Sequence, residues 1–368
     1  MMKIPLIKPY IDTAIKQKVL EVLDSGYLTE GPVTKDFENK ISAYVDTDYA
    51  IAVTSCTTGL ELALRALKIG QGDEVIVPDY TYPATASVVP IVGATAVIVD
   101  VSKNSMLIDY DALENAITEK TKAIIPVSAF GNPLDYERLN YIKNKYNLYI
   151  VEDAAPSLGA EYNHQKVGSL ADITVFSFHP RKFITTGEGG VVTTNNQKWA
   201  EWMISYKHFG MDMSANSREG IQFHQIGTNY KLSNILSAVG LGQMIKIDTL
   251  LAKRRDLARQ YIELIGTKSG ISLPITTSKG EHSYQSFIVY VDNRDEIMTQ
   301  MRSEGIEVQI GTYSLHMHHA FNDHPLVRVE GDMCNSRWCF DHALTLPLFN
   351  DLTLEQQKRI INELRKHL

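Results

Sequence analysis

Leu148-Tyr-Ile-Val-Glu-Asp-Ala-Ala-Pro-Ser-Leu-Gly159 is an apolar run that ends in two acids and a turn. The run lacks polar alternation, which is typical of a strand in a sheet that helices cover on both faces. Asp153, at the carboxyl end of this strand, is costly to bury unless it has a cationic partner. The alternative is an aspartate that caps a helix or forms a turn.

Six similar short runs surround this one between about residues 50 and 195. They lie at Ala50–Thr54, Glu74–Val77, Ala96–Asp100, Ala123–Val127, Ile173–Phe176 and Gly190–Thr194. Amphipathic helix patterns stand between them, such as Thr57–Lys68 and Asp135–Tyr146. This alternation predicts an α/β fold with a largely parallel sheet, in which ligands bind beyond the carboxyl ends of the strands.

The pattern changes in the last third of the chain. Residues 228–265 form a long helical segment, and its run Lys253-Arg-Arg is expected to be a solvated helix face. Beyond a loop, the expected elements are a strand at Ser286–Val291, a helix at Arg294–Gly305, a short strand at Val308–Ile310 and a helix at Leu354–Leu368. We therefore expect a large domain over residues 1–248, including an N-terminal arm, and a small α+β domain over residues 249–368.

Length and composition exclude several classes of protein. The 368 residues are too many for one small core, and a net charge of −7 without a basic block argues against nucleic acid or an anionic membrane as partner. The three cysteines fit a reducing compartment better than a disulfide framework. The N-terminus lacks the long apolar core of a signal peptide, so we expect a cytoplasmic protein.

A glycine-rich stretch contains a lysine suited to nucleophilic chemistry. In Ser177-Phe-His-Pro-Arg-Lys-Phe-Ile-Thr-Thr-Gly-Glu-Gly-Gly190, Lys182 stands between a strand-like run and a glycine-rich turn. An amine held in this way suits a Schiff base with an aldehyde cofactor, and the alternative is a surface lysine in a loop. Asp153 and Lys182 follow successive strands, so both can reach one ring, whose protonated pyridine nitrogen the carboxylate would keep charged.

A turn before a helix offers a site for an anion. Val53-Thr-Ser-Cys-Thr-Thr-Gly59 reads as a strand end, a small-residue turn and a helix start. Free backbone N–H groups there, with the hydroxyls of Thr57 and Thr58, suit a phosphate, although capping threonines begin many helices. Ser177 can add another hydroxyl donor.

Two further groups of side chains invite a functional interpretation. Tyr82 follows a strand and a proline, and its ring could stack on a planar cofactor or pack in the core. The run Tyr313-Ser-Leu-His-Met-His-His319 contains three histidines. Because no acid or cysteine cluster completes a metal site nearby, we expect no metal, and His316 and its neighbours are expected to contact substrate or lie on the surface.

Taken in order, four motifs resemble the pyridoxal-phosphate-dependent sugar aminotransferases of the DegT/DnrJ/EryC1/StrS family. They are the turn before the phosphate-type helix, Glu152-Asp-Ala-Ala155, the Ser177–Gly190 loop and Gly227-Thr-Asn-Tyr-Lys-Leu-Ser233. The resemblance covers nearly the whole chain. It implies fold type I, with a large cofactor-binding domain around a seven-stranded, mostly parallel sheet, and a small C-terminal domain. It also implies a homodimer with the active site at the subunit interface.

The resemblance also implies a role for individual residues. Lys182 would form the Schiff base with pyridoxal 5'-phosphate, and Asp153 would pair with the pyridine nitrogen. The other implied cofactor contacts are Thr57, Thr58 and Ser177 at the phosphate, Tyr82 at the ring face, and Asn229 at the phosphate from the other subunit. Cys56 and Pro156 depart from the residues that are common in the family. Some relatives carry histidine in place of the lysine and dehydrate the sugar, so Lys182 favours amino transfer.

These inferences lead to one main hypothesis and several alternatives. The main hypothesis is transamination of a nucleotide-linked 4-keto-6-deoxy sugar by an amino acid donor, L-glutamate, for surface polysaccharide such as O-antigen or for another glycoconjugate, in the manner of GDP-perosamine synthase. The alternatives are amination at C3, an eliminating enzyme that retains its lysine, and a catalytically idle sensor that binds the cofactor. The candidate substrate contacts are Tyr27, Thr29, Glu188, Tyr313 and His316.

Overall fold

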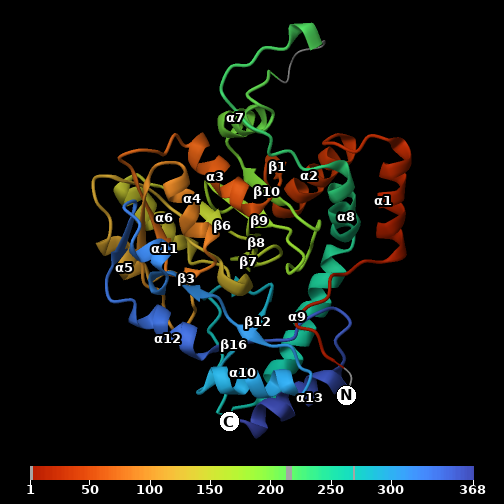
Figure 1. The fold of residues 1–368 in the computed structure, drawn as a ribbon, viewed down its shortest axis with the longest axis vertical. Helices are drawn as coiled ribbons and strands as arrows, with labels where there is room; N and C mark the ends of the chain where they lie inside the picture. The colour runs from red at the N-terminus through yellow and green to blue at the C-terminus, as the bar shows by residue number, and fades with distance from the viewer. Residues whose placement is uncertain (1–2, 213–217, 268–269) are drawn as a thin grey trace.

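The computed structural model describes residues 3–212, 218–267 and 270–368. A large sheet lies in the middle of the molecule, and α8 and α9 run down one side of it (Figure 1). A small C-terminal sheet, with helices α10 and α13, lies at the end of the molecule where both termini are found. The predicted mixed α/β fold with a large, mostly parallel sheet is confirmed.

The central sheet has eight strands in the order β1-β10-β9-β6-β5-β2-β4-β15. Their bounds are β1 Tyr49–Val53, β10 Gly190–Thr194, β9 Ile173–Ser177, β6 Tyr149–Asp153, β5 Thr121–Ile124, β2 Glu74–Pro78, β4 Thr95–Val99 and β15 Val327–Glu330. All seven predicted strands are present, and β15 pairs in parallel with β4 as an eighth strand. Only β10 runs antiparallel to its neighbours, so the other seven strands end at one edge.

Alternate residues of the strands enter separate cores on the two faces of the sheet. In β1, Ile51 and Val53 belong to the cluster that contains α3 and α4 residues, whereas Ala50 and Ala52 belong to the cluster that contains α2 and α9 residues. Both faces are therefore apolar, which explains why these strands read as continuous hydrophobic runs. Gly59 lets α3 approach the sheet closely, because a Cβ there would lie 2.6 Å from Val175 Cγ1.

The helices around the sheet include the two predicted there, at Thr57–Lys68 and Asp135–Tyr146. They are α1 Thr13–Ser25, α2 Pro32–Val45, α3 Cys56–Ala66, α4 Ala84–Ile91, α5 Tyr110–Asn115, α6 Tyr136–Tyr146, α7 Gln197–Lys207, α8 Asn234–Met244 and α9 Ile247–Ile265. The segment predicted as one long helix is two, because α8 and α9 meet at a bend of 64°. Within the described residues no single helix is long and apolar enough to cross a membrane, and α8 with α9 meets that test only as a bent pair.

A second, smaller sheet lies in the C-terminal part of the chain. Its strands are β12 Phe287–Tyr290, β16 Ala343–Leu346 and β13 Gln309–Ile310, and its neighbouring helices are α10 Arg294–Ser303, α12 Cys334–His342 and α13 Leu354–Lys366. Helix α9 joins this core to the larger one, because Leu250 and Leu251 pack in the large core and Leu257 and Tyr261 in the small one. The domain boundary predicted at residue 248 falls at the start of α9 and stays a prediction.

Several shorter elements complete the fold. They are β3 Tyr80–Thr81, β7 Glu161–Tyr162, β8 Gln165–Lys166, β11 Gly280–Glu281, β14 Tyr313–Ser314, α11 His319–Asn322 and the 3-10 turns Ala129–Gly131, Arg218–Gly220 and Leu315–Met317. One expectation about a surface was wrong. Arg254, predicted to lie on a solvated helix face, is only 2% exposed, and its guanidinium donates to backbone carbonyls.

A segment between α7 and α8 projects from the body of the molecule (Figure 1). This projecting segment, residues 208–212 and 218–228, exposes the apolar side chains of Phe209, Phe223 and Ile226, of which Ile226 is 95% exposed. Its base is held by Lys207, whose buried ammonium group lies 3.1 Å from a carboxylate oxygen of Glu30 and 3.3 Å from one of Glu38. Removing one partner of such a pair would leave a buried charge uncompensated, which is strongly destabilising.

Strand β6 carries a buried carboxyl group with a raised pKa. Glu152 of β6 is fully buried and accepts hydrogen bonds from Ser128 and, at 2.8 Å, from Tyr136. Its second oxygen, Oε2, has no partner among the described residues. Burial raises the pKa of Glu152 from 4.5 to about 7. The folded protein therefore holds a proton on Glu152 over a pH range in which the unfolded chain has lost it.

The variant Glu152→Gln should be more stable than the wild-type protein above neutral pH. Because the folded-state pKa lies above the unfolded one, wild-type stability falls as pH rises from 4.5 to about 7, and glutamine removes this loss. We expect the variant's advantage to grow by about 2–3 kcal/mol between pH 5 and pH 8. Urea unfolding at fixed protein concentration measures this difference. An advantage that does not change with pH would contradict the assignment.

Candidate active site

A buried carboxylate marks the carboxyl edge of the central sheet. Asp153 is the last residue of β6 and is only 5% exposed. Its Oδ2 accepts a hydrogen bond from Thr85 Oγ1 at 2.7 Å, and its Oδ1 accepts one from Ala155 N at 3.1 Å. No lysine, arginine or histidine of the described chain forms an ion pair with it. Burial raises the pKa of Asp153, while the Thr85 hydroxyl and the Ala155 N–H oppose this rise.

Lys182 lies beside this carboxylate in the loop that follows β9. Its backbone N–H donates to His179 O at 2.8 Å, which closes a tight turn at residues 179–182. Burial lowers the pKa of Lys182, and the nearby Asp153 carboxylate and Cys56 thiol partly oppose that effect. The amine is therefore shifted toward the neutral form, which is the nucleophilic one.

The turn between β1 and α3 presents free backbone donors. Ser55 caps α3, and Thr58 completes a capping box, because Ser55 N donates to Thr58 Oγ1 at 3.0 Å and Thr58 N donates to Ser55 Oγ at 3.1 Å. The N–H groups of Cys56 and Thr57 have no acceptor in the described part of the chain. These two donors at a helix N-terminus suit an anion, whereas the Thr58 hydroxyl is already engaged with the helix.

Glycine at position 190 brings this turn against the lysine loop. A Cβ on Gly190 would lie 2.6 Å from the carbonyl of Ser55 and 2.7 Å from Cys56 N. Gly190 is the first residue of β10 and pairs with both Val53 and Ser177. Ser177, the last residue of β9, is half-buried at the same edge, as the sequence predicts. The phosphate contacts expected of Thr57, Thr58 and Ser177 stay predictions.

Two tyrosines and a histidine lie together beyond the end of β2. The ring of Tyr82 is 66% exposed, which excludes core packing, and its centroid lies 6.3 Å from that of Tyr313. His316 is held by the buried carboxylate of Asp79, through Nδ1 at 2.6 Å and the backbone N–H at 2.7 Å. The loop that carries Tyr313 and His316 is thus fixed to the end of β2.

Two hydroxyl groups connect the β3–β14 ribbon to Asp153. Thr81 Oγ1 lies 2.9 Å from Thr85 Oγ1, which in turn donates to Asp153. Thr81 also pairs with Tyr313 in the small ribbon of β3 and β14. Sequence reasoning missed Thr85 and Asp79, since a threonine inside a helix and an aspartate after a strand carry no signal of such distant partners.

The remaining predicted site residues are three substrate contacts, Tyr27, Thr29 and Glu188, and one cofactor contact, Asn229. Tyr27 and Thr29 are exposed, and their carbonyls accept hydrogen bonds from Asn234 at the start of α8. Asn229 is exposed at the base of the projecting segment, where it forms an isolated antiparallel β-bridge with His208. Glu188 is exposed, and its carboxylate lies 3.9 Å from His179. Their predicted roles stay predictions.

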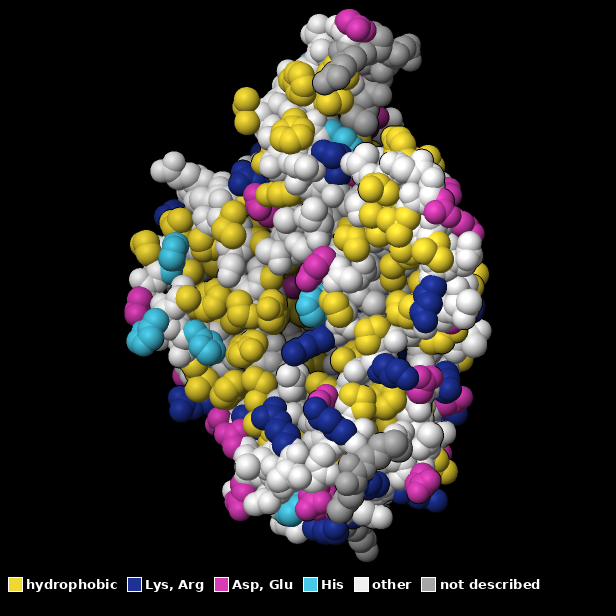
Figure 2. Space-filling model, turned by 45° about the vertical axis from the view of Figure 1, so that its right-hand side comes forward, with side chains coloured by type: hydrophobic (Ala, Val, Ile, Leu, Met, Phe, Trp, Pro, Cys, Tyr) yellow, Lys and Arg dark blue, Asp and Glu magenta, His cyan; other side chains and the backbone are white. Residues whose placement is uncertain are grey.

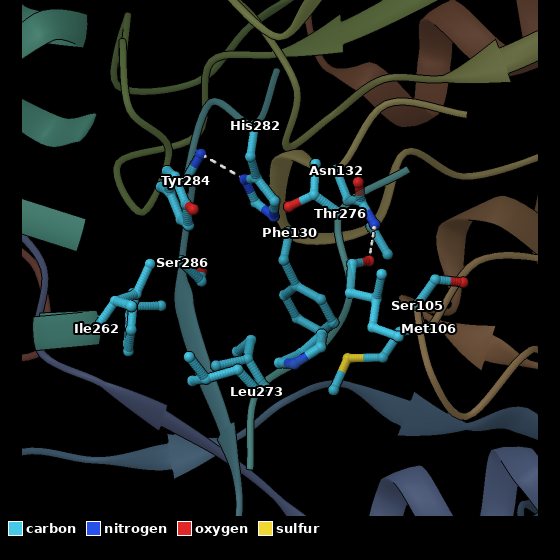
Figure 3. A pocket seen from close by; sticks show the side chains of 15 residues that line it. Ser105, Met106, Phe130, Asn132, Ile262, Leu273, Thr276, His282, Tyr284 and Ser286 are labelled. Carbon is cyan, nitrogen blue, oxygen red and sulfur yellow. Dashed lines mark hydrogen bonds between the residues drawn. The ribbon is translucent and has the colours of Figure 1, made fainter. Parts of the chain in front are cut away.

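A separate hollow lies elsewhere and is not the candidate site. Figure 3 shows it between the segment of His282, Tyr284 and Ser286 and the side chains of Phe130 and Leu273. None of the predicted site residues lines it. Among the described residues, no group of three or more His, Cys, Asp and Glu side chains could hold a metal ion.

The edge residues fit pyridoxal phosphate in three respects. Asp153 is a buried carboxylate without a cation, which suits a protonated ring nitrogen. Lys182 has a lowered pKa, which suits attack on an aldehyde. The free N–H groups of Cys56 and Thr57 suit a phosphate. These features come from β6, β9 and β1, and six of the seven strands that end at this edge pair in parallel.

Comparison with known proteins agrees with this geometry. MJ1066 of Methanocaldococcus jannaschii, an uncharacterized protein, is 33% identical over 375 residues, covering 99% of this chain and 97% of that protein. Spr1654 of Streptococcus pneumoniae, described as a sugar aminotransferase and solved in its PMP form, is 32% identical, with 99% and 98% coverage and a TM-score of 0.92. DesV of S. venezuelae, solved with a ketimine intermediate, is 31% identical, with 100% and 99% coverage and a TM-score of 0.92. Residues 9–365 match the DegT/DnrJ/EryC1/StrS aminotransferase family, and the chain belongs to it.

Proposed function

We propose that this aminotransferase moves an amino group from L-glutamate to the ketone of a nucleotide-linked 4-keto-6-deoxy sugar. Membership of the family makes the protein a pyridoxal-phosphate-dependent transaminase, and its relatives support sugar amination in general. The observation that carries the proposal is that the half-buried Lys182 lies beside the buried carboxylate of Asp153 at one edge of the sheet. The amino sugar would serve a surface polysaccharide or another glycoconjugate.

Lys182 is the proposed base and nucleophile. Pyridoxal phosphate, when bound, supplies an aldehyde that reacts with amines and a ring that withdraws electrons. Burial lowers the pKa of Lys182, so its Nζ can attack a carbonyl and can later take a proton from the α-carbon of the amino acid. In the second half-reaction the same Nζ returns a proton to the sugar carbon that receives nitrogen. One group thus serves both halves, and ping-pong kinetics should result.

Asp153 is the proposed partner of the ring nitrogen. Thr85 and the Ala155 N–H hold its two oxygens at 2.7 and 3.1 Å, so the carboxylate cannot rotate freely. A carboxylate fixed in this way keeps a facing pyridine nitrogen protonated. Cys56 stands 3.8 Å from the same carboxylate, and burial raises the pKa of its thiol well above the usual value, so it acts as a neutral neighbour.

The sugar is proposed to enter past Tyr82, Tyr313 and His316. The aromatic faces of the two tyrosines suit the apolar side of a deoxy sugar. The hydrogen bond between Asp79 and Nδ1 of His316 fixes the orientation of the imidazole ring. Amination at C3 uses the same chemistry and stays the nearest alternative. An idle sensor stays an alternative of another class, but it could lose Lys182, whereas this chain keeps the lysine and holds its pKa below the usual value.

A homodimer with shared active sites is the proposed assembly. Figure 2 shows hydrophobic side chains on the projecting segment and on the face beside it. Those of Phe209, Phe223 and Ile226 are exposed, as are Leu20 and Leu23 of α1. Exposed apolar groups gathered in this way mark a protein interface. Asn229, at the base of the projecting segment, would reach the phosphate in the other subunit.

Turnover should depend on Lys182 and should reveal the sugar. The holoenzyme, given glutamate and a panel of nucleotide-linked keto sugars, is expected to aminate a 4-keto-6-deoxy sugar, and NMR of the product identifies the ring carbon. Lys182→Ala should lower kcat by about 10³-fold or more, because nucleophile and base are both lost. Amination at C3 would replace the substrate part of the proposal. Full turnover by the variant would overturn the mechanism.

Asp153→Asn should impair chemistry far more than a similar change nearby. A neutral amide cannot keep the ring nitrogen charged, so we expect kcat to fall roughly 100-fold or more. Asp100→Asn is the matched control, because Asp100 follows β4 at the same edge but accepts N–H groups of Asn335 and Ser336. The control should keep wild-type turnover. Equal losses in both variants would point to a general defect of the edge and count against the assignment.

Two impaired variants should restore each other if Asn229 acts across the dimer. Asn229→Ala should bind pyridoxal phosphate about tenfold more weakly. Co-expression with Lys182→Ala yields mixed dimers with one intact site, so random mixing should recover about a quarter of wild-type sites at limiting cofactor. Lys182→Ala with Asp153→Asn is the control, since both defects then lie in each subunit's own site. Recovery in the control, or none in the test, contradicts shared sites.

A further inference from the structure

The backbone on both sides of Lys182 is held by one buried side chain. Phe183 N donates to Gln285 Oε1 at 2.6 Å, and Gln285 Nε2 donates to Arg181 O at 2.6 Å. The glutamine amide therefore pairs with the residue before and the residue after the lysine, as a neighbouring strand would. Gln285 is 7% exposed and is distant in sequence, by 102 residues from Phe183.

Gln285 belongs to the C-terminal part of the fold. It stands just before β12. The residues directly before and after it, Tyr284 and Ser286, line the separate hollow of Figure 3. Gly131 allows this segment to approach the 3-10 turn Ala129–Gly131 closely, because a Cβ there would lie 2.9 Å from Tyr284 N and 3.0 Å from Gln285 N. The amide thus reaches the lysine loop from the small sheet.

Arg254 fixes Gln285 in turn. Its guanidinium donates to the carbonyls of Tyr284, of Gln285 at 2.6 Å and of Leu348 at 3.3 Å, and it lies 5.4 Å from the centre of the Phe183 ring. Arg254 forms no ion pair within the described residues. Its planar guanidinium therefore connects α9, by hydrogen bonds to backbone carbonyls, with the segments before β12 and after β16.

A second glutamine holds the same loop further on. Thr185 N donates to Gln243 Oε1 at 3.2 Å, and Gln243 Nε2 donates to Thr185 O at 2.6 Å. Gln243 belongs to α8 and is fully buried. It pairs with a residue three positions after the lysine. The chain thus contains a matched pair of amides, of which only Gln285 brackets Lys182 directly.

We propose that Gln285, fixed by Arg254, is the positioning residue for Lys182 and makes the placement of the amine depend on the C-terminal sheet. The proposal rests on the proposed function, in which Lys182 takes a proton from the α-carbon of the amino acid and later returns a proton to the sugar carbon. A proton-transfer group must lie within hydrogen-bonding distance of its target, and a displacement of about 1 Å can cost about 10²-fold in rate. A side chain that fixes both flanking peptide groups controls that distance.

Gln285→Met tests the proposal, because methionine keeps the length and removes both hydrogen bonds. In the holoenzyme we expect the rate of the glutamate half-reaction, followed by stopped-flow absorbance, to fall tenfold or more, with KM for glutamate changed about threefold at most. In the protein without cofactor, mass spectrometry should show faster hydrogen exchange at the Phe183 amide. Arg254→Met should reproduce both effects more weakly.

Gln243→Met is the matched control. It should speed hydrogen exchange at the Thr185 amide and lower the unfolding temperature, with a smaller loss of half-reaction rate than Gln285→Met. If Gln285→Met does not fold, Arg254→Met serves instead, because it keeps the Gln285 amide and removes the donors that fix this residue. That variant should show an intermediate loss of rate.

Three results would overturn the proposal. They are an unchanged half-reaction rate in Gln285→Met, an unchanged exchange rate at the Phe183 amide, or equal rate losses in both glutamine variants, which would mean a general structural role. Failure of the proposed function looks different. In that case borohydride reduction of the wild-type holoenzyme would attach no cofactor to Lys182, while the exchange protection at Phe183 without cofactor would remain.

Discussion

A carboxylate buried without a cation is the constraint on which the site depends. Asp153 lies at the end of a central strand, and two neutral donors occupy its oxygens. Burying a charge in this way is unfavourable unless a cationic partner completes it, so the protein gains when a protonated ring binds there. The free N–H groups at the start of α3 would hold the phosphate of that cofactor, and the amine of Lys182 would bind its aldehyde.

Glu152, the residue before Asp153, meets the cost of burying a carboxyl group in a different way. Glu152 points to the other face of β6, where Ser128 and Tyr136 hold one of its oxygens and burial raises its pKa to about 7. A carboxyl group in that position can avoid the cost of burial by keeping its proton. Asp153 faces the ligand edge instead, where a cation can be supplied from outside. The alternation of side chains along one strand therefore separates a structural acid from a functional one.

Local patterns predicted the strands well, because residues buried on both faces leave an apolar run that is readable without partners. They also placed Asp153 and Lys182 at one edge, since successive parallel strands end together. Strand β15 was missed because its sequence, Val-Arg-Val-Glu, alternates and lies far from its partner β4 in the chain. Arg254 was misjudged because a charged residue in a helical pattern indicates solvent, whereas its actual acceptors are carbonyls up to 94 residues away.

The choice of neutral groups around Lys182 has a physical reason. An additional carboxylate near the amine would raise its pKa and undo the effect of burial, whereas an amide can hold the backbone without changing the charge nearby. Gln285 and Gln243 use amides for this purpose, and Thr185 adds a hydroxyl that donates to Phe178 O at 2.8 Å. Among the described residues, Asp153 is then the one carboxylate whose charge raises the pKa of Lys182. Rigid but uncharged support therefore lets one loop keep its lysine in place and still reactive.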